Sequence, residues 1–167
     1  MQNIILIGMP GCGKTTTGRL LAKKLNINFV DCDEVFTQTI FPDISAYFSQ
    51  YGEDSFRRKE TEILRQLSKN TNCVISTGGG VVERPENKKI LQGGGVVVFI
   101  NRPPEDIVCD VDTSSRPLLA EGRNRIFTLY EKRISKYKNF CNIEIENNGA
   151  LDALTDKIIN EVNSYNG

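Results

Sequence analysis

A glycine-rich segment, Gly8–Thr15, has the residue types and spacing of a phosphate-binding loop. It matches the pattern G-x-x-x-x-G-K-[ST]. Glycines let the backbone curl so that its N–H groups surround phosphate oxygens, while the lysine supplies a cation and the threonine hydroxyl can ligate Mg²⁺. The loop follows an apolar run, Asn3–Ile7, and opens an amphipathic stretch, Lys14–Leu25, a context that disfavours a chance glycine-rich turn. The pattern therefore predicts that nucleoside triphosphate is bound by Gly11, Cys12, Gly13, Lys14, Thr15 and Thr16.

Two carboxylates, Asp31 and Asp33, follow the apolar run Asn28–Val30. Ligands bind beyond the carboxyl ends of the strands in an open α/β sheet, so this position lies on the functional edge. Residues two apart in an extended segment point to the same side, and we expect both carboxylates to face one pocket. One would orient hydrated Mg²⁺ and the other would accept a hydrogen bond from a substrate hydroxyl. One of them could instead cap the next helix, and at Asp33 both roles are compatible.

Two glycine triplets differ in their position relative to the predicted strands. Gly78-Gly79-Gly80 follows an apolar run and is expected on the functional edge, where glycine lets a ligand approach the backbone. Gly93-Gly94-Gly95 precedes a strand and is expected on the opposite edge. We interpret the second triplet as a turn without chemical function.

Arg57 and Glu60 are three residues apart in a helical stretch, so they share a helix face. The spacing alone favours an exposed, weak ion pair. In the functional alternative, Arg57 binds an anionic substrate through its planar guanidinium and Glu60 holds that group in place. Arg133 and Tyr137, four apart in another predicted helix, carry no independent sign of function.

The segment 111–124 is rich in Asp, Ser, Thr, Pro and Gly and interrupts the alternation of apolar runs. A polar loop of this length in a compact domain is typical of a lid or of a disordered segment. Arg116 lies in it, and the proline at 117 disfavours a helical conformation at Arg116. An arginine on a mobile loop can stabilise transferring phosphates, although a solvated surface arginine is the simpler interpretation of this residue alone.

Short apolar runs alternate with amphipathic stretches, which predicts an α/β fold with a parallel sheet covered by helices on both faces. No repeat or linker divides the 167 residues, so we expect one domain, 1–167. The predicted strands are Asn3–Ile7, Asn28–Val30, Cys73–Thr77, Val96–Ile100 and Ile143–Ile145. The predicted helices are Lys14–Leu25, about Asp33–Phe41, Asp54–Ser68, Pro85–Leu91, Pro104–Asp110, Arg125–Asn139 and Leu151–Ser164.

The composition excludes several classes of function. Basic and acidic residues number 21 each, so no excess of cations exists to neutralise a nucleic-acid backbone. No apolar run approaches the length of a membrane span, and the amino terminus lacks the features of a signal peptide. Histidine is absent, which removes Ser-His and Cys-His nucleophiles. Five cysteines without C-x-x-C spacing argue against disulfides and zinc, so we expect a cytoplasmic protein with reduced thiols.

Taken together, these residues resemble the shikimate kinase family over most of the chain. The P-loop occurs in many families, whereas the later motifs are more specific in this order. The matching motifs are Gly8–Thr15, Asp31-x-Asp33, Gly52-Glu53-x-x-Phe56-Arg57-x-x-Glu60, Gly78-Gly79-Gly80, Arg116-Pro117-Leu118-Leu119 and Arg133-x-x-x-Tyr137.

The resemblance implies transfer of the γ-phosphoryl group of ATP to the 3-hydroxyl of shikimate, giving shikimate 3-phosphate and ADP. This reaction belongs to the pathway to chorismate and the aromatic amino acids. The resemblance also implies Mg²⁺ as cofactor, usually a monomer, and a three-layer fold of the nucleoside monophosphate kinase type. That fold has a five-stranded parallel sheet, a substrate-binding region at about 33–61 and a mobile lid at about 111–124.

The same resemblance implies a role for each motif residue. Lys14, Asp33 and Arg116 would be catalytic, and Arg116 would also join the P-loop residues in binding ATP. Thr15 would ligate the metal directly and Asp31 would act on it through water. The residues expected to bind the acceptor are Asp33, Arg57, Glu60, Gly78, Gly79, Gly80 and Arg133.

The sequence departs from the family pattern around the adenine. Cys109 stands where many members carry an arginine, and the loop 147–149 lacks the basic residue often found there. A P-loop kinase for gluconate or a nucleoside monophosphate is one alternative, although neither is expected to combine all the later motifs. A GTPase is disfavoured because no Asn-Lys-x-Asp motif is present. A non-catalytic nucleotide-binding module is disfavoured because every position needed for catalysis is present.

Overall fold

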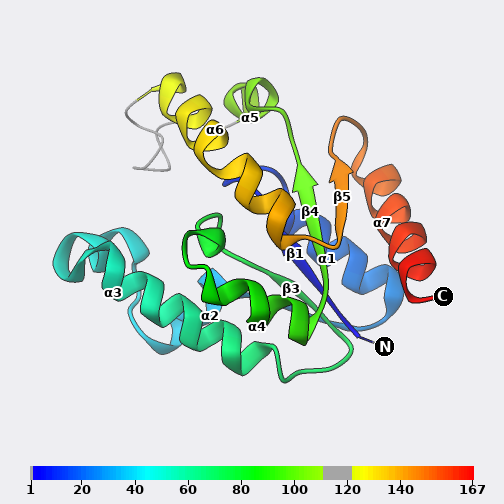
Figure 1. Ribbon diagram of the computed structural model, residues 1–167, viewed down its shortest axis with the longest axis horizontal. Helices are drawn as coiled ribbons and strands as arrows, with labels where there is room; N and C mark the ends of the chain where they lie inside the picture. The colour runs from blue at the N-terminus through cyan, green and yellow to red at the C-terminus, as the bar shows by residue number, and fades with distance from the viewer. Residues whose placement is uncertain (1, 111–121) are drawn as a thin grey trace.

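The computed structural model describes residues 2–110 and 122–167, and its centre is a five-stranded sheet (Figure 1). The strands are β1 (Asn3–Ile7), β2 (Asn28–Asp31), β3 (Cys73–Ser76), β4 (Gly95–Asn101) and β5 (Ile143–Glu146). They lie in the order β2-β3-β1-β4-β5, and all neighbouring pairs are parallel. All carboxyl ends therefore meet at one edge, where ligands bind in open sheets of this kind.

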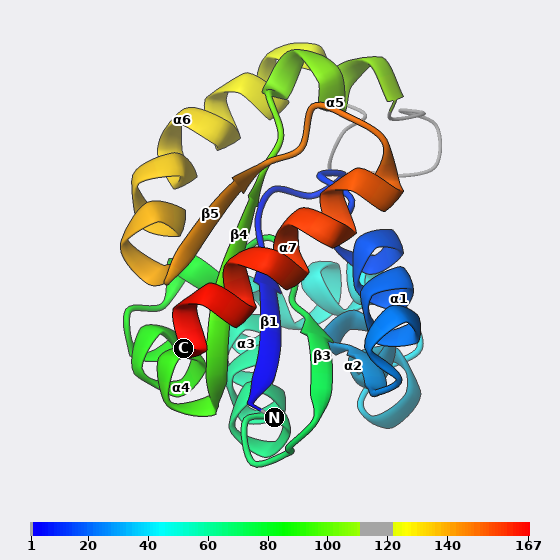
Figure 2. The same ribbon diagram turned by 90° about the vertical axis from the view of Figure 1, so that its right-hand side faces the viewer.

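Helices cover both faces of the sheet, so the predicted three-layer α/β fold is confirmed. They are α1 (Lys14–Leu25), α2 (Cys32–Thr39), α3 (Ile44–Leu67), α4 (Glu86–Gly94), α5 (Pro104–Asp110), α6 (Arg123–Phe140) and α7 (Leu151–Asn166), with a 3-10 helix, η1, at Val81–Glu83. Helices α1 and α7 pack together on one face, and α3, α4 and α6 lie on the other (Figures 1 and 2). Among the helices of the described ranges, none has the length and apolar character needed to span a bilayer.

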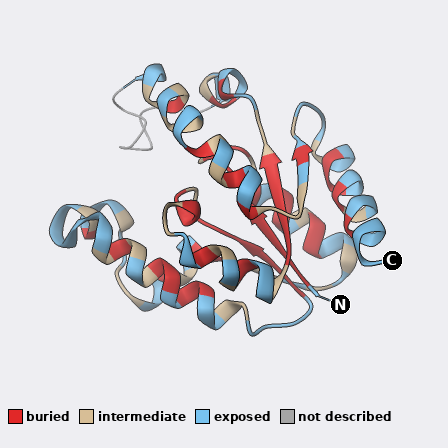
Figure 3. Cartoon of the chain, in the orientation of Figure 1, coloured by how far each residue is buried: buried red, intermediate tan, exposed pale blue. Residues whose placement is uncertain are grey.

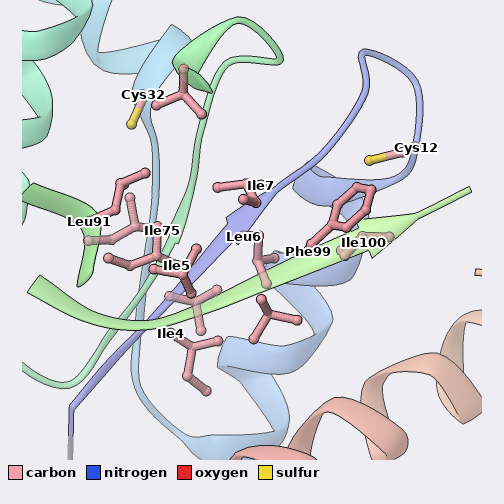
Figure 4. Close-up of a cluster of buried hydrophobic side chains, with 14 of the residues drawn as sticks. Ile4, Ile5, Leu6, Ile7, Cys12, Cys32, Ile75, Leu91, Phe99 and Ile100 are labelled. Carbon is pink, nitrogen blue, oxygen red and sulfur yellow. The ribbon is translucent and has the colours of Figure 1, made fainter. Parts of the chain in front are cut away.

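The central strands are buried on both faces (Figure 3). Every residue of β1 is buried, and its side chains lie among those of β3 and β4, such as Ile75 and Phe99 (Figure 4). A strand covered on both faces appears in the sequence as a continuous apolar run. For this reason β1 could be recognised from Asn3–Ile7 alone.

Helix α3 is longer than the sequence predicts. It starts at Ile44, where the Asp43 carboxylate caps it by accepting from the Ala46 N–H at 2.8 Å, whereas the prediction began at Asp54. The backbone kinks at Gly52, with a φ of 81°, so two helical segments meet there. The earlier segment is held by tertiary packing, because the Tyr47 ring lies edge-on to Phe36 at 5.1 Å. Such long-range packing leaves no mark in the local pattern.

The second glycine triplet is not the predicted turn. Helix α4 continues to Gly94, and β4 begins at Gly95. Its predicted place on the opposite edge is confirmed, because Gly95 pairs with Asn3 at the start of β1. A methyl group on Gly94 would lie 2.7 Å from Cβ of Ser68, so close packing of α4 on the end of α3 accounts for glycine there.

Candidate active site

The phosphate-binding loop connects β1 to α1, at the edge predicted from the sequence. Gly11 and Gly13 have φ angles of 80° and 98°, which glycine adopts freely and other residues rarely do. Helix α1 begins directly after Gly13. The first N–H groups of the helix and the positive end of its dipole are therefore directed at the loop, where an anion would bind. The Lys14 ammonium donates to the carbonyl oxygens of Gly8 and Met9 at 2.9 Å each. The loop therefore presents a cation and backbone donors together.

Thr15 and Asp31 form a pair of oxygen donors beside this loop. The Thr15 hydroxyl donates to Oδ2 of Asp31 at 2.7 Å. Oδ1 of Asp31 accepts from the N–H groups of Asp33 and Glu34 at 2.9 and 3.4 Å, so Asp31 caps α2. This corrects the expectation that Asp33 could be the cap. Because α2 begins at Cys32, Asp31 and Asp33 are not in one extended segment, and the argument from extended spacing does not apply.

Asp33 approaches the glycine triplet that follows β3. A methyl group on Gly78 would lie 3.3 Å from Oδ1 of Asp33 and 2.6 Å from Oε1 of Glu60. Both carboxylates therefore lie close to the same backbone position, and glycine leaves room for the Glu60 side chain. The structure brings Asp33, Glu60 and Gly78 together although they are far apart in the sequence.

The next two glycines continue this close packing. A methyl group on Gly79 would lie 2.6 Å from Cδ of Pro10 in the P-loop, and one on Gly80 would overlap the guanidinium of Arg57. The backbone of Gly78-Gly79-Gly80 thus lies between the P-loop and Arg57, with no side chain of the triplet in between. Its predicted place at the edge formed by the carboxyl ends of the strands is confirmed.

Arg57 and Glu60 form a buried ion pair, with 2.9 Å between Nη1 and Oε2. Their side chains are 11% and 3% exposed, so the exposed pair that the spacing favours is wrong. Arg57 Nε and Glu60 Oε1 are buried and have no hydrogen-bond partner among the described residues. Burial raises the pKa of the Glu60 carboxyl, and the charge of Arg57 counteracts part of this effect. A buried arginine with unused donor capacity is suited to an anionic ligand.

A second buried arginine, Arg133 of α6, is held by Glu83 of η1. Nε of Arg133 lies 2.7 Å from one oxygen of Glu83, and the Lys136 ammonium lies 2.6 Å from the other. The Tyr137 hydroxyl donates to the carbonyl of Gly79 at 2.6 Å, which fixes α6 on the glycine triplet. Sequence analysis missed Glu83, because only the fold brings residue 83 beside residue 133.

Glu83 stabilises the fold in its ionised form. Burial alone would raise the pKa of this carboxyl, but hydrogen bonds from Lys136 and Arg133 lower it from 4.5 to about 2. The ionised form is therefore favoured by folding above pH 4.5, and this contribution is lost as the pH falls towards 2.

We expect Glu83→Gln to lower the free energy of unfolding by about 1–3 kcal/mol at pH 7. The difference from the parent protein should shrink as the pH falls from 4.5 towards 2, and urea unfolding at pH 7 and pH 3 measures it. Glu62→Gln is the control, because the Glu62 side chain is half exposed and, among the described residues, forms an ion pair with Lys59 alone. Its effect should stay below about 0.5 kcal/mol. A Glu83→Gln effect of equal size at both pH values would contradict the assignment.

A cavity of about 500 Å³ lies beside the P-loop. Gly13, Thr16, Arg102 and Asn147 are among its lining residues. Nη1 of Arg102 donates to the carbonyl of Gly11 at 3.3 Å, and the Asn147 amide donates to the carbonyl of Cys12 at 3.0 Å. Arg102 is absent from the sequence candidates because its position after β4 carries no motif. Asn147 belongs to the loop 147–149, which the family resemblance relates to the adenine without giving Asn147 a role. The carboxyl ends of β4 and β5 were the available signal.

Two predicted features fall wholly or mostly outside the described residues. Arg116 lies in the segment 111–121, as does most of the lid expected at 111–124. Arg123 and Asn124 are described and belong to the first turn of α6, which begins two residues before its predicted start.

Comparison with known proteins adds independent evidence at this point. The family model described as shikimate kinase matches residues 10–163. A shikimate kinase of Clostridium botulinum (strain Alaska E43 / Type E3) is 43% identical over 159 residues, which cover 95% of this chain and 96% of that protein. The chain belongs to the shikimate kinase family.

Solved structures of shikimate kinases share the fold. The structure of the Acinetobacter baumannii shikimate kinase in complex with shikimate aligns with a TM-score of 0.92 and 32% identity, over 99% of this chain and 94% of that one. The Aquifex aeolicus shikimate kinase aligns with a TM-score of 0.83 and 32% identity, over 98% and 97%. The predicted family and its five-stranded fold are confirmed.

Of the two departures from the shikimate kinase pattern, the loop 147–149 lines the cavity beside the P-loop, and Cys109 lies in α5, which reaches the cavity through Asp106. Cys109 is exposed in α5, whose last residue, Asp110, pairs with Arg102. The loop 147–149 places Asn147 and Asn148 at the cavity instead of a basic residue. An arginine is thus present at this cavity, but it comes from the end of β4 and not from position 109.

Proposed function

We propose that this protein transfers the γ-phosphoryl group of ATP to the 3-hydroxyl of shikimate, giving shikimate 3-phosphate and ADP. The observation that carries the proposal is the group of Asp33, Arg57 and Arg133 around the glycine triplet next to the P-loop. Shikimate has one carboxylate and three hydroxyls, which require cations and a hydrogen-bond acceptor, and this group supplies both. The relatives' names support the same activity. We place this activity in the biosynthesis of chorismate and aromatic amino acids.

On the donor side, the P-loop would hold the phosphates of ATP. Backbone N–H groups from Gly11 to Thr16 would bind the phosphate oxygens, that of Cys12 only by giving up its bond to the Met9 carbonyl. Lys14 would likewise exchange its loop carbonyls for phosphate oxygens. Arg116 would add a second cation to the transferring group. The cavity beside the loop would take the adenosine.

Mg²⁺ is the cofactor that we propose. Thr15 would ligate it directly and Asp31 would hold it through water, because a hydroxyl and a carboxylate 2.7 Å apart suit a hard cation with an oxygen coordination shell. When bound, the ion neutralises charge on the phosphates during transfer.

On the acceptor side, Arg57 and Arg133 would bind the shikimate carboxylate, with Glu60 supporting Arg57 and the Gly78-Gly79-Gly80 backbone completing the site. Asp33 would accept a hydrogen bond from the 3-hydroxyl and orient its oxygen towards the γ-phosphorus. As the new O–P bond forms, the bond to the ADP oxygen breaks and the hydroxyl proton passes to Asp33 or to solvent.

We further propose a single kinase domain that acts as a cytoplasmic monomer, without nucleic-acid or membrane partners. The substrate-binding region at 33–61 includes α2 and most of α3, which carry Asp33, Arg57 and Glu60. Sedimentation of the purified protein with and without substrates would measure its state of association. A stable dimer would contradict the proposed monomer.

The test of function is ADP release from Mg²⁺-ATP with different acceptors. We expect shikimate to stimulate ADP release, whereas gluconate and a set of nucleoside monophosphates should not. If one of the other acceptors stimulated ADP release instead, that acceptor would be the substrate and the assignment of shikimate would be wrong. If ATP hydrolysis were the same with every acceptor, nucleotide binding would still be supported, but the kinase assignment would be contradicted.

A further inference from the structure

Asn147 connects the end of β5 to the phosphate-binding loop. Its side-chain amide donates to the carbonyl of Cys12 at 3.0 Å. Its own N–H donates to the carbonyl of Asn101 at 2.8 Å, so its backbone is anchored to the end of β4. Asn147 is thus a donor in a fixed place against the loop.

The hydrogen bond to Cys12 determines the direction of a neighbouring N–H group. In a planar trans peptide the carbonyl and the following N–H point to opposite sides. Because the Cys12 carbonyl faces Asn147, the N–H of Gly13 points away from Asn147, and no described residue accepts from it. Rotation of this peptide would remove one phosphate donor from the loop.

The neighbouring peptides are already constrained by other bonds. The N–H of Cys12 donates to the carbonyl of Met9 at 3.1 Å, and the carbonyl of Gly13 accepts from the N–H of Thr17 at 2.9 Å. The peptide between Cys12 and Gly13 lies between them, and its carbonyl is held by a side chain. With a φ of 98°, Gly13 has the flexible backbone for which such support matters most.

We propose that Asn147 is a positioning residue that holds the Gly13 N–H towards the phosphates of the nucleotide. The inference rests on the proposed function only in that ATP is the ligand of the loop. Asn147 also lines the cavity proposed for adenosine, so a direct contact with the base is the competing explanation.

Inorganic triphosphate separates these explanations, because it occupies the loop and has no base. We expect Asn147→Ala to weaken the binding of Mg²⁺-ADP and of inorganic triphosphate in parallel, each by about fivefold to tenfold. Asn147→Asp should weaken both further, since it places a carboxylate oxygen against the Cys12 carbonyl. Calorimetry without acceptor measures both ligands, and the KM for shikimate should stay unchanged.

The matched control is Asn142, which flanks the other end of β5. It accepts from the N–H of Val97 at 2.9 Å and donates to the Tyr165 hydroxyl at 3.0 Å, and neither partner belongs to the loop. Asn142→Ala should lower thermal stability without changing triphosphate affinity. Equal losses in both alanine variants would overturn the proposal, and so would a loss of ADP binding with triphosphate binding intact.

Different measurements would show that the positioning role of Asn147 is wrong and that the proposed function is wrong. Parallel losses in Asn147→Ala support the positioning role even if shikimate does not stimulate ADP release. Unchanged affinities in Asn147→Ala would overturn the positioning role even if the parent protein phosphorylates shikimate. A parent protein that binds neither ADP nor triphosphate would contradict both.

Discussion

Replacing Arg57 with alanine should raise the KM for shikimate by about one to three orders of magnitude and leave the KM for ATP nearly unchanged. Arg57 is largely buried against Gly80 and Glu60, and its Nε has no partner among the described residues. Loss of the guanidinium removes the proposed contact with the shikimate carboxylate and leaves the buried Glu60 charge unpaired. Steady-state kinetics with each substrate varied in turn measures the two KM values.

Two further variants distinguish a binding role of Arg57 from a structural one. Arg57→Lys keeps a charge beside Glu60 but loses the planar fork, so it should restore much of the stability and little of the shikimate affinity. Arg58→Ala removes the next side chain of α3, which is 68% exposed and pairs with Asp54. It should leave both KM values unchanged. Unchanged shikimate kinetics in Arg57→Ala would remove Arg57 from the site.

Replacing Asp33 with asparagine should lower kcat by about two to four orders of magnitude with little effect on ATP binding. The amide keeps the shape of the carboxylate but loses its charge, so it is a poorer acceptor for the 3-hydroxyl proton. Oδ1 of Asp33 lies by Gly78, whereas the Thr15 hydroxyl bonds to Asp31, so metal binding should persist. Single-turnover kinetics at saturating substrates measures the chemical step.

The matched control for Asp33 is Glu34, the next residue of α2. Glu34 is exposed and pairs with Arg19 on α1, away from the glycine triplet. Glu34→Gln should keep kcat within about twofold of the parent value. A decrease in kcat of less than about tenfold in Asp33→Asn would exclude Asp33 as the acceptor of the hydroxyl proton and leave it at most an orienting group.

The acceptor site illustrates which predictions depended on local pattern and which on packing. The P-loop and the triplet Gly78-Gly79-Gly80 were located correctly, because each follows a buried strand and the carboxyl ends of parallel strands share one edge. Arg57 and Glu60 were assigned by spacing to an exposed pair, yet they are buried. Spacing reports which residues share a helix face, but burial depends on the elements that pack against that face.

The sequence by itself predicted the α/β class, the phosphate-binding loop and the positions of the strands. These features could be predicted because apolar runs and glycine spacing are properties of neighbouring residues. Tertiary structure alone decided the rest. It brought Glu83 to Arg133, Asp33 to Glu60 and Asn147 to the carbonyl of Cys12. Each of these contacts joins separate elements, so its existence depends on how strands and helices pack and not on the residues beside it in the chain.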